Sequence, residues 1–251
     1  KLLIKKLIKI KPKIIINCSA YTQVDLAEVE KKKAKIINSD SLKILSKYCY
    51  KNKIFLIHFS TDYVYSGFGK LPWKETYKCN PINFYGKTKY LGEKNIINSK
   101  CKFIILRLSW LYGPHGKSNF VLKILQNAKI NKILNIVNDQ FGSPTSTNLV
   151  IKVLKKFLIN IKKSQQISGI FNLCPKEFTS RSDLTYFILK NNLKKNIFKN
   201  IKINEIKTNE LKLMARRPLN SRMNINKISN FLNIEIKSWK FYLKKYLLSV
   251  N

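Results

Sequence analysis

The chain has 251 residues, of which 45% are hydrophobic, and its 49 Lys and Arg against 13 Asp and Glu give a formal net charge of +36. This apolar content excludes a disordered chain and fits one α/β unit with a modest second lobe. No run approaches the roughly 18 apolar residues of a membrane span, and the lysines are spread along the chain rather than gathered as in a nucleic-acid-binding stripe or tail.

The first half of the chain alternates predicted helices with buried strands. Residues 1–10 place Leu3, Leu7 and Ile10 among lysines, which predicts an amphipathic helix. A membrane-surface helix would have a similar pattern, but an apolar strand follows directly, so we expect this helix to cover a sheet. The next expected elements are a strand at 14–18, helices at 26–37 and 41–50, a strand at 54–59, a helix at 82–97 and a strand at 103–108.

The second half is less regular. We expect, in order, a helix at 120–128, a strand at 133–137, a loop at 139–145, a helix at 147–158, a strand at 169–173 and shorter helices to the end. Strands that alternate with helices predict a parallel sheet. The fold class is therefore α/β, a Rossmann-like doubly wound parallel sheet with a smaller C-terminal lobe interleaved with it.

Cysteine and histidine usage gives no sign of a metal site. The five cysteines, Cys18, Cys49, Cys79, Cys101 and Cys174, form no CxxC pair, and His58 and His115 are the only histidines, so no zinc constellation is present and we expect no metal. An odd cysteine count without a secretory signal favours a reducing, cytoplasmic location.

Polar clusters follow three successive apolar strands. They are Ser19-Ala20-Tyr21, Ser60-Thr61-Asp62 and Ser109-Trp110. Ligands of open parallel sheets bind at the carboxyl ends of the strands, so these clusters are candidate site residues. Any one of them alone would be an ordinary strand-terminating loop.

The strongest candidate for chemistry is the pair Tyr85 and Lys89. Residues four apart share one face of a helix, and a lysine ammonium beside a phenol is expected to lower the phenol pKa from about 10. Such a tyrosine can exchange a proton with a substrate oxygen, and the Thr61 hydroxyl could hold the same oxygen. The YxxxK spacing also occurs at Tyr90/Lys94 and Tyr186/Lys190. Only Tyr85 lies between a buried strand ending in Ser-Thr-Asp and another buried strand, so we interpret the other two pairs as solvated helix faces.

Together these motifs resemble the dTDP-4-dehydrorhamnose reductase family of the extended short-chain dehydrogenase/reductases. The resemblance covers nearly the whole chain in the family's order. It is carried by Asn17–Thr22 with Val24-Asp25 and Ala27-Glu28, Ser60–Tyr65, Tyr85–Lys89 with Gly92-Glu93, Arg107–Gly113, Asn119–Val121, Asp139–Thr145, and Arg217-Pro218 with Ser221.

The resemblance implies NAD(P)H-dependent reduction of the 4-keto group of dTDP-4-dehydro-L-rhamnose in dTDP-rhamnose biosynthesis, with NADPH or NADH as cofactor. The implied catalytic residues are Tyr85 as proton donor, Lys89 as its activator and cofactor-ribose ligand, and Thr61. The implied cofactor contacts are Ser19, Ala20, Tyr21, Tyr85 and Lys89, and the implied substrate contacts are Thr61, Asp62 and Trp110. Arg216 and Arg217 could meet the diphosphate or form an exposed ion pair.

Residues 1–137 would then form the NAD(P)-binding core, and residues 138–251 mainly the substrate-binding lobe. The implied partner is a dTDP-sugar. We expect no nucleic-acid or membrane partner, and a homodimer is possible.

The sequence departs from the family at its beginning. The family opens with a strand and a Gly-rich turn whose amides receive the cofactor diphosphate, whereas the first glycine here is Gly67 and residue 1 is Lys. We therefore expect a chain that is truncated before the family's third strand, with weak NADPH binding and impaired activity.

Two other functions fit part of the pattern. Another nucleotide-sugar reductase or epimerase would share the Tyr-Lys chemistry, although Trp110 and Asp139-Gln140 favour the first interpretation. A non-catalytic relative, such as the regulatory subunit of methionine adenosyltransferase, would share the fold. The presence of Thr61, Tyr85 and Lys89 together favours an enzyme.

Overall fold

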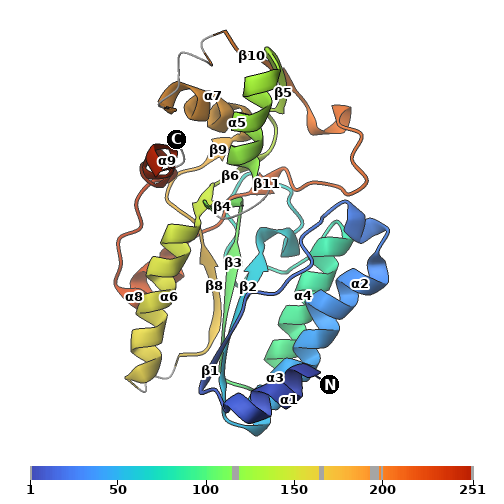
Figure 1. Cartoon of the computed structure of the whole chain (residues 1–251), viewed down its shortest axis with the longest axis vertical. Helices are drawn as coiled ribbons and strands as arrows, with labels where there is room; N and C mark the ends of the chain where they lie inside the picture. Colours follow the sequence, from blue (N-terminus) through green and yellow to red (C-terminus); the bar gives the residue numbers. More distant parts are fainter. Residues whose placement is uncertain (1, 115–118, 164–166, 193–197, 199, 250–251) are drawn as a thin grey trace.

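A computed structural model describes residues 2–114, 119–163, 167–192, 198 and 200–249. Its centre is a four-stranded sheet in the order β1-β2-β3-β8, and every neighbouring pair is parallel. The strands are β1 (Ile14–Asn17), β2 (Phe55–Thr61), β3 (Phe103–Leu108) and β8 (Gly169–Leu173). The prediction of a parallel α/β sheet is confirmed (Figure 1).

Helices cover both faces of this sheet (Figure 1). One side carries α1 (Leu2–Ile10), α2 (Lys31–Lys35), α3 (Ser41–Lys51) and α4 (Phe84–Asn98), and the other carries α6 (Thr147–Lys162) and α8 (Asn226–Leu232). Because successive strand residues point to opposite faces, Leu56 packs in the cluster under α1, α3 and α4, whereas Ile57 packs in the cluster under α6. Burial of both faces explains why β2 and β3 are mostly apolar rather than alternating.

A second lobe lies beyond the carboxyl ends of the sheet. It is built from α5 (Phe120–Ile130), β5 (Ile133–Val137), α7 (Arg181–Asn191), β10 (Lys202–Ile206) and α9 (Trp239–Ser249), with β5 and β10 paired in parallel. These helices and β5 share one apolar cluster that includes Ile124, Leu184 and Trp239. Short strands join the lobe to the sheet: β4 (Leu111–Tyr112), β6 (Phe141–Gly142), β7 (Thr145–Ser146), β9 (Thr179–Ser180) and β11 (Asn220–Ser221).

The chain crosses between the two lobes repeatedly. Elements α5 and β5 precede residue 138 and pack with α7 and α9, whereas α6 and β8 follow it and pack on the central sheet. The division into 1–137 and 138–251 therefore stays a prediction about function, because the two largest apolar clusters draw on both segments.

Three local expectations differ from the structure. The helix expected at 26–37 is divided into a 3-10 turn (Leu26–Glu28), α2 and a π-helical turn (Ile36–Asp40) that leads into α3. Strand β2 continues through Thr61, so Ser60 and Thr61 belong to the strand itself. Strand β10 was not expected, because its sequence Lys-Ile-Asn-Glu-Ile has no apolar run and its extended form depends on pairing with β5.

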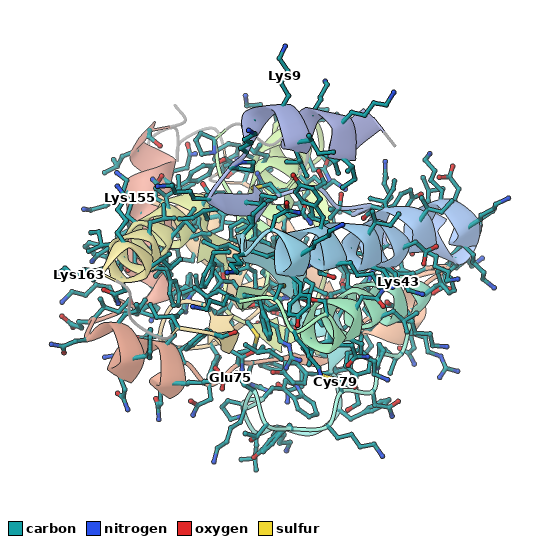
Figure 2. All side chains as sticks on the ribbon, turned by 90° about the horizontal axis from the view of Figure 1, so that it is seen from below. Lys9, Lys43, Glu75, Cys79, Lys155 and Lys163 are labelled. Atoms are coloured by element: carbon teal, nitrogen blue, oxygen red, sulfur yellow. The ribbon has the colours of Figure 1, made fainter. Side chains whose placement is uncertain are left out.

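The lysines project from different sides of the molecule. In Figure 2, Lys9 on α1 projects from the top of the molecule, whereas Lys155 on α6 lies at the left and Lys43 on α3 at the right. Among the described residues, no helix is both long and apolar enough to cross a membrane. His115 lies outside the residues that the structure describes.

Candidate active site

A cavity of about 700 Å³ lies at the carboxyl ends of β2 and β3. Its polar lining includes Thr61, Asp62, Tyr63, Tyr85, Lys89 and Arg181, and its apolar lining includes Phe59, Leu108, Trp110, Val150, Ile151 and Leu154. The structure thus brings Thr61, Tyr85 and Lys89 to one cavity, from β2 and α4. A volume of this order is typical of small-molecule sites.

The start of α4 sets the position of Tyr85. Asn83 caps the helix by accepting a hydrogen bond from the Gly86 amide (2.8 Å), as N-cap asparagines do. A Cβ at Gly86 would lie only 2.3 Å from the carbonyl oxygen of Tyr63, so only glycine allows this close approach. The helix therefore begins directly against the turn that follows Thr61, and the next helical turn carries Lys89.

The predicted effect of Lys89 on the Tyr85 pKa is wrong for this structure. Burial raises the Tyr85 pKa well above its usual value, and the neighbouring Thr61 hydroxyl offsets this only in part. The sequence spacing gave the correct face of the helix but not the direction taken by the Lys89 side chain. A phenol with a raised pKa remains protonated at neutral pH and can donate a proton.

The ammonium of Lys89 binds groups on β2. Its Nζ donates to the carbonyl oxygen of Phe59 (2.6 Å) and lies 3.2 Å from Nε2 of His58. Nδ1 of His58 is in turn 3.1 Å from the side-chain nitrogen Nδ2 of Asn17 on β1. Burial lowers the Lys89 pKa to about 8 and the His58 pKa well below its usual value. His58 was missed by the sequence analysis, since an isolated histidine in an apolar strand gives no functional signal.

Asp62 is a buried carboxyl group in the same cavity. Its Oδ1 accepts a hydrogen bond from the Thr61 hydroxyl (3.1 Å), while Oδ2 has no hydrogen-bond partner among the described residues. Burial raises its pKa to about 6, against the opposing effect of the hydroxyls of Ser221 and Thr61. A buried carboxyl oxygen without a hydrogen-bond partner costs free energy. This oxygen can accept a hydrogen bond from a bound molecule.

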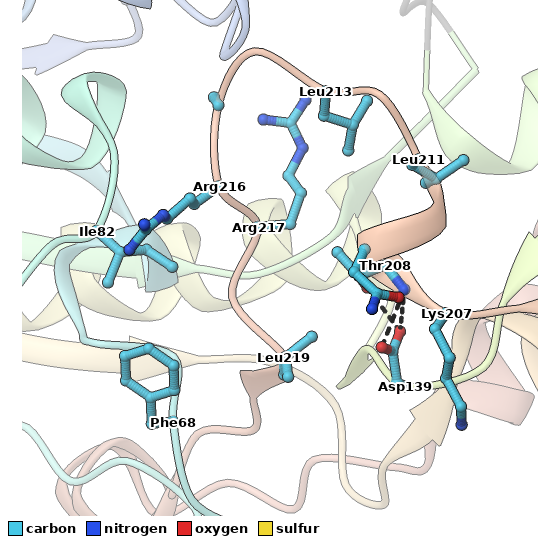
Figure 3. Close-up of a pocket in the computed structure, with 12 residues that line it drawn as sticks. Phe68, Ile82, Asp139, Lys207, Thr208, Leu211, Leu213, Arg216, Arg217 and Leu219 are labelled. Carbon is cyan, nitrogen blue, oxygen red and sulfur yellow. Dashed lines mark hydrogen bonds between the residues drawn. The ribbon is translucent and has the colours of Figure 1, made fainter.

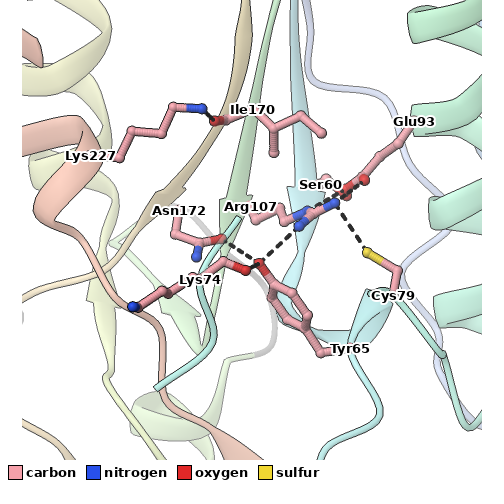
Figure 4. Close-up of polar contacts among 9 residues, drawn as sticks. All are labelled: Ser60, Tyr65, Lys74, Cys79, Glu93, Arg107, Ile170, Asn172 and Lys227. Atoms are coloured by element: carbon pink, nitrogen blue, oxygen red, sulfur yellow. Dashed lines mark hydrogen bonds and ion pairs between the residues drawn. The ribbon is translucent and has the colours of Figure 1, made fainter. Parts of the chain in front are cut away.

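Behind the cavity, a buried ion pair joins α4 to β3. Arg107 binds Glu93 through Nε to Oε1 (3.0 Å) and Nη2 to Oε2 (2.6 Å), with both side chains at most 2% exposed. Glu93 also accepts from the Ser60 hydroxyl (2.5 Å), and Arg107 Nη1 donates to the Tyr65 hydroxyl (2.8 Å) (Figure 4). Because Glu93 lies one turn beyond Lys89, this network fixes α4 against the residue that precedes Thr61.

Trp110 lies at the end of β3, where its backbone is left-handed (φ 46°). The Gly142 Cα approaches its indole so closely that a Cβ there would lie 2.8 Å from Cε2. The guanidinium of Arg181 lies over the same ring, with its Cζ 3.6 Å from the ring centroid. A non-glycine residue with positive φ is strained, and such strain is concentrated at functional sites.

Of the three predicted cofactor contacts at the end of β1, only Ala20 lines the cavity, beside Cys18 and Thr22. Ser19 is exposed and its amide donates to the Asn17 side chain (3.2 Å). Tyr21 is buried elsewhere, where its hydroxyl donates to Glu30 (2.9 Å). The roles of Ser19 and Tyr21 as cofactor contacts stay predictions.

A second cavity of about 560 Å³ contains the arginines considered in the sequence analysis (Figure 3). Asp139 lines this cavity and accepts a hydrogen bond from the Thr208 hydroxyl (2.6 Å). Arg216 is exposed, whereas Arg217 is partly buried and pairs with Asp25 through Nη2. Arg217 Nη1 has no hydrogen-bond partner among the residues described.

The lining fits one end of the NADPH or NADH that the family resemblance implies. Lys89 could bind ribose hydroxyls, and the Tyr85 phenol is close enough to Thr61 to share a substrate oxygen with it. The sequence has no glycine before Gly67, so the residues present include no Gly-rich turn for the diphosphate. Within the described part of the chain, no group of three or more His, Cys, Asp or Glu side chains could hold a metal ion.

Comparisons with known proteins show which family the chain is similar to. Residues 2–251 match the family model described as the RmlD substrate binding domain. The chain is 32% identical over 240 residues to the dTDP-4-dehydrorhamnose reductase of Salmonella typhimurium, covering 95% of this chain and 80% of the relative.

Solved structures of similar proteins share the fold. A dTDP-4-dehydrorhamnose reductase ortholog from Clostridium acetobutylicum superposes with a TM-score of 0.88 at 32% identity, covering 98% of this chain and 84% of that one. The Bacillus anthracis dTDP-4-dehydrorhamnose reductase in complex with NADP gives 0.85 at 30% identity, covering 98% and 83%.

Proposed function

The chain belongs to the dTDP-4-dehydrorhamnose reductase family, and on that premise we propose that it reduces the 4-keto group of dTDP-4-dehydro-L-rhamnose to give dTDP-L-rhamnose. The observation that carries the proposal is the presence of Thr61, Tyr85 and Lys89 around one cavity. The relative crystallised with NADP supports NADPH as cofactor, with NADH as the alternative.

When bound, the nicotinamide cofactor would supply the hydride that reduces carbon 4 of the sugar. Tyr85 donates its phenolic proton to the oxygen of that carbonyl group, which becomes a hydroxyl, and the phenolate then recovers a proton. The Tyr85 phenol is protonated at neutral pH, so it carries the proton that this step requires. The Thr61 hydroxyl, which donates to Asp62 in this structure, turns to donate a hydrogen bond to the same oxygen and stabilises the charge that develops on it.

Lys89 and Asp62 hold the reactants. The Lys89 ammonium is fixed by the Phe59 carbonyl and positioned to bind ribose hydroxyls. Asp62 Oδ2 is a free acceptor for a sugar hydroxyl, and Trp110 supplies an apolar face. Ala20, with Ser19 and Tyr21, is proposed to lie along the cofactor. The substrate is proposed to be a dTDP-sugar, handled in the cytoplasm by a monomer or homodimer.

The test is a turnover assay with dTDP-4-dehydro-L-rhamnose and either NADPH or NADH in excess, with the sugar product identified by mass and NMR. We expect formation of dTDP-L-rhamnose and oxidation of the nicotinamide in equal amounts. Tyr85→Phe should lower kcat by roughly 10²- to 10⁴-fold, the usual contribution of a general acid.

The matched control is Tyr186→Phe, which alters a YxxxK tyrosine that is 49% exposed on α7 and outside the cavity. It should leave turnover unchanged. Reduction of another nucleotide 4-keto sugar in preference to this one would contradict the proposed substrate, and undiminished turnover by Tyr85→Phe would remove Tyr85 from the mechanism.

A further inference from the structure

Arg181 is a cation in the cavity that the proposed chemistry does not use. It is the first residue of α7, and Ser180 caps the helix by accepting from the Asp183 amide (2.9 Å). Its own backbone amide donates to the carbonyl oxygen of Gln140 (3.2 Å). The backbone is therefore anchored from two sides, and the side chain enters the cavity from the second lobe.

Two aromatic rings hold the guanidinium of Arg181. Its Cζ lies 3.6 Å from the centroid of Trp110 and 4.4 Å from that of Phe120. Stacking on an aromatic face engages the plane of a guanidinium and leaves its N–H edge for hydrogen bonds in that plane. The arrangement is that of an arginine held ready for a planar or bidentate acceptor.

No acceptor within the described residues occupies that edge. No hydrogen bond or ion pair joins the guanidinium to any side chain that the structure describes, unlike Arg107 with Glu93 or Arg217 with Asp25. Burial lowers the Arg181 pKa to about 10, so the group is still charged at neutral pH. A partly buried charge without an acceptor calls for an anion.

The surrounding charges indicate where that anion would lie. The buried Tyr63 phenol feels the charges of Arg181 and Arg217, which lower its pKa, and that of Asp62, which raises it. The sugar hydroxyls of a substrate would meet Asp62, and a negatively charged group would be repelled from it towards the arginines. Arg217 lines the second cavity, whereas Arg181 lines the first.

We propose that Arg181, stacked between Trp110 and Phe120, binds the diphosphate of the sugar nucleotide and determines specificity for a diphosphate-linked substrate. The proposal rests on the proposed function for the identity of the ligand, and it adds a residue and a subsite to it. Arginine matches phosphate oxygens in a bidentate geometry that lysine does not reproduce.

Two other interpretations are open to test. Arg181 could act only as a counter-charge for Asp62, or it could bind the diphosphate of the nicotinamide cofactor instead. In the first case, its loss would leave phosphate recognition unchanged. In the second, its loss would weaken the cofactor rather than the sugar nucleotide.

The experiment measures the equilibrium binding of dTDP, thymidine and NADPH, each alone, to the wild type, Arg181→Met and Arg181→Lys. We expect Arg181→Met to weaken dTDP roughly 10- to 100-fold, as loss of charge-assisted hydrogen bonds would, and to leave thymidine and NADPH unchanged. Arg181→Lys should recover only part of the dTDP affinity. Arg222→Met is the matched control, since Arg222 stacks on Phe141 (4.3 Å) but lines neither cavity.

Equal losses for dTDP and thymidine would overturn the proposal, as would undiminished dTDP binding or a loss confined to NADPH. If Arg181→Met does not fold, Arg181→Lys decides the question by the ratio of dTDP to thymidine affinity. These measurements need no turnover. An inactive protein that still shows the Arg181 effect would contradict the proposed reaction and leave the diphosphate subsite supported.

Discussion

The ammonium of Lys89 contacts the imidazole of His58, with Nζ 3.2 Å from Nε2. Both side chains are almost completely buried, at 2% and 1% exposure. Because burial keeps the imidazole neutral, the histidine adds no positive charge beside the lysine. Lys89, one helical turn from Tyr85, is therefore held by residues of β2, the strand that ends at Thr61.

This environment predicts an alkaline limit to activity. Burial lowers the Lys89 pKa to about 8, so the ammonium is present below that pH and lost as the pH rises through it. We expect kcat/KM to fall above about pH 8, well before the Tyr85 phenol ionises. The measurement is the pH profile of kcat/KM, which reports groups of the free enzyme. In Lys89→Arg the limit should move to higher pH, whereas Lys94→Arg, on the exposed side of α4, should retain it. An unchanged limit in Lys89→Arg would assign it to another group.

Asp62 should make the stability depend on pH. Its pKa is about 6 in the folded protein and 3.8 in the ordinary carboxyl group, so between these values the folded state retains a proton that the unfolded state has lost. The contribution that protonated Asp62 makes to the free energy of unfolding at low pH is therefore lost as the pH rises from about 4 to 6. Relative to the wild type, Asp62→Asn should gain up to about 3 kcal/mol over that interval. Urea unfolding at several pH values measures the difference, with Asp40→Asn on the surface as control, and parallel curves for Asp62→Asn would contradict the prediction.

The buried pair of Glu93 and Arg107 should be needed as a pair. Removing one partner leaves a buried charge without a counter-charge, so Glu93→Gln or Arg107→Met should cost roughly 3–5 kcal/mol in the free energy of unfolding. The double substitution should cost less than the sum of the two, which a double-mutant cycle detects. Glu235→Gln breaks an exposed pair (51% and 62% exposed) and should cost under about 1 kcal/mol. Additive single losses would show that the two side chains are not coupled.

Gly142→Ala should act on Trp110 and, through it, on the Arg181 stack. The added Cβ would lie 2.8 Å from Cε2 of the indole, so the ring must shift. We expect weaker dTDP binding and a change in tryptophan fluorescence. In a Trp110→Phe background the smaller ring leaves room, and Gly142→Ala should then have little further effect on binding. The same loss in both backgrounds would locate the effect elsewhere.

Much of the fold follows from apolar periodicity. The buried strands β2, β3 and β8 are mostly apolar, and α6 has the spacing of an amphipathic helix. Strand β10 lacks such a pattern because both its faces carry polar residues, and its conformation comes from a partner nearly 70 residues away, in the register Asn204 to Asn135. Non-local pairing of this kind leaves no local signal.

The candidate site could be predicted only in part, because local spacing places some of its residues and non-local contacts place the others. Helical spacing places Tyr85 and Lys89 on one face, and the strand-end rule brings Thr61 to them. The direction of the Lys89 side chain depends on the carbonyl of Phe59, which spacing alone does not reveal. Arg181 was missed because Ser180 and Asp183 signal only the start of a helix, and its two aromatic partners come from distant segments.

The repeated crossing of the chain between its two lobes has a consequence for how the protein comes apart. Separation of the polypeptide between β5 and β6 would leave α5 without α7 and α9, and α6 and β8 without the sheet that they complete. Neither fragment would contain a complete hydrophobic core. Heat or denaturant should therefore unfold both lobes in one cooperative step, so the parts of the cavity that each lobe contributes should be lost together.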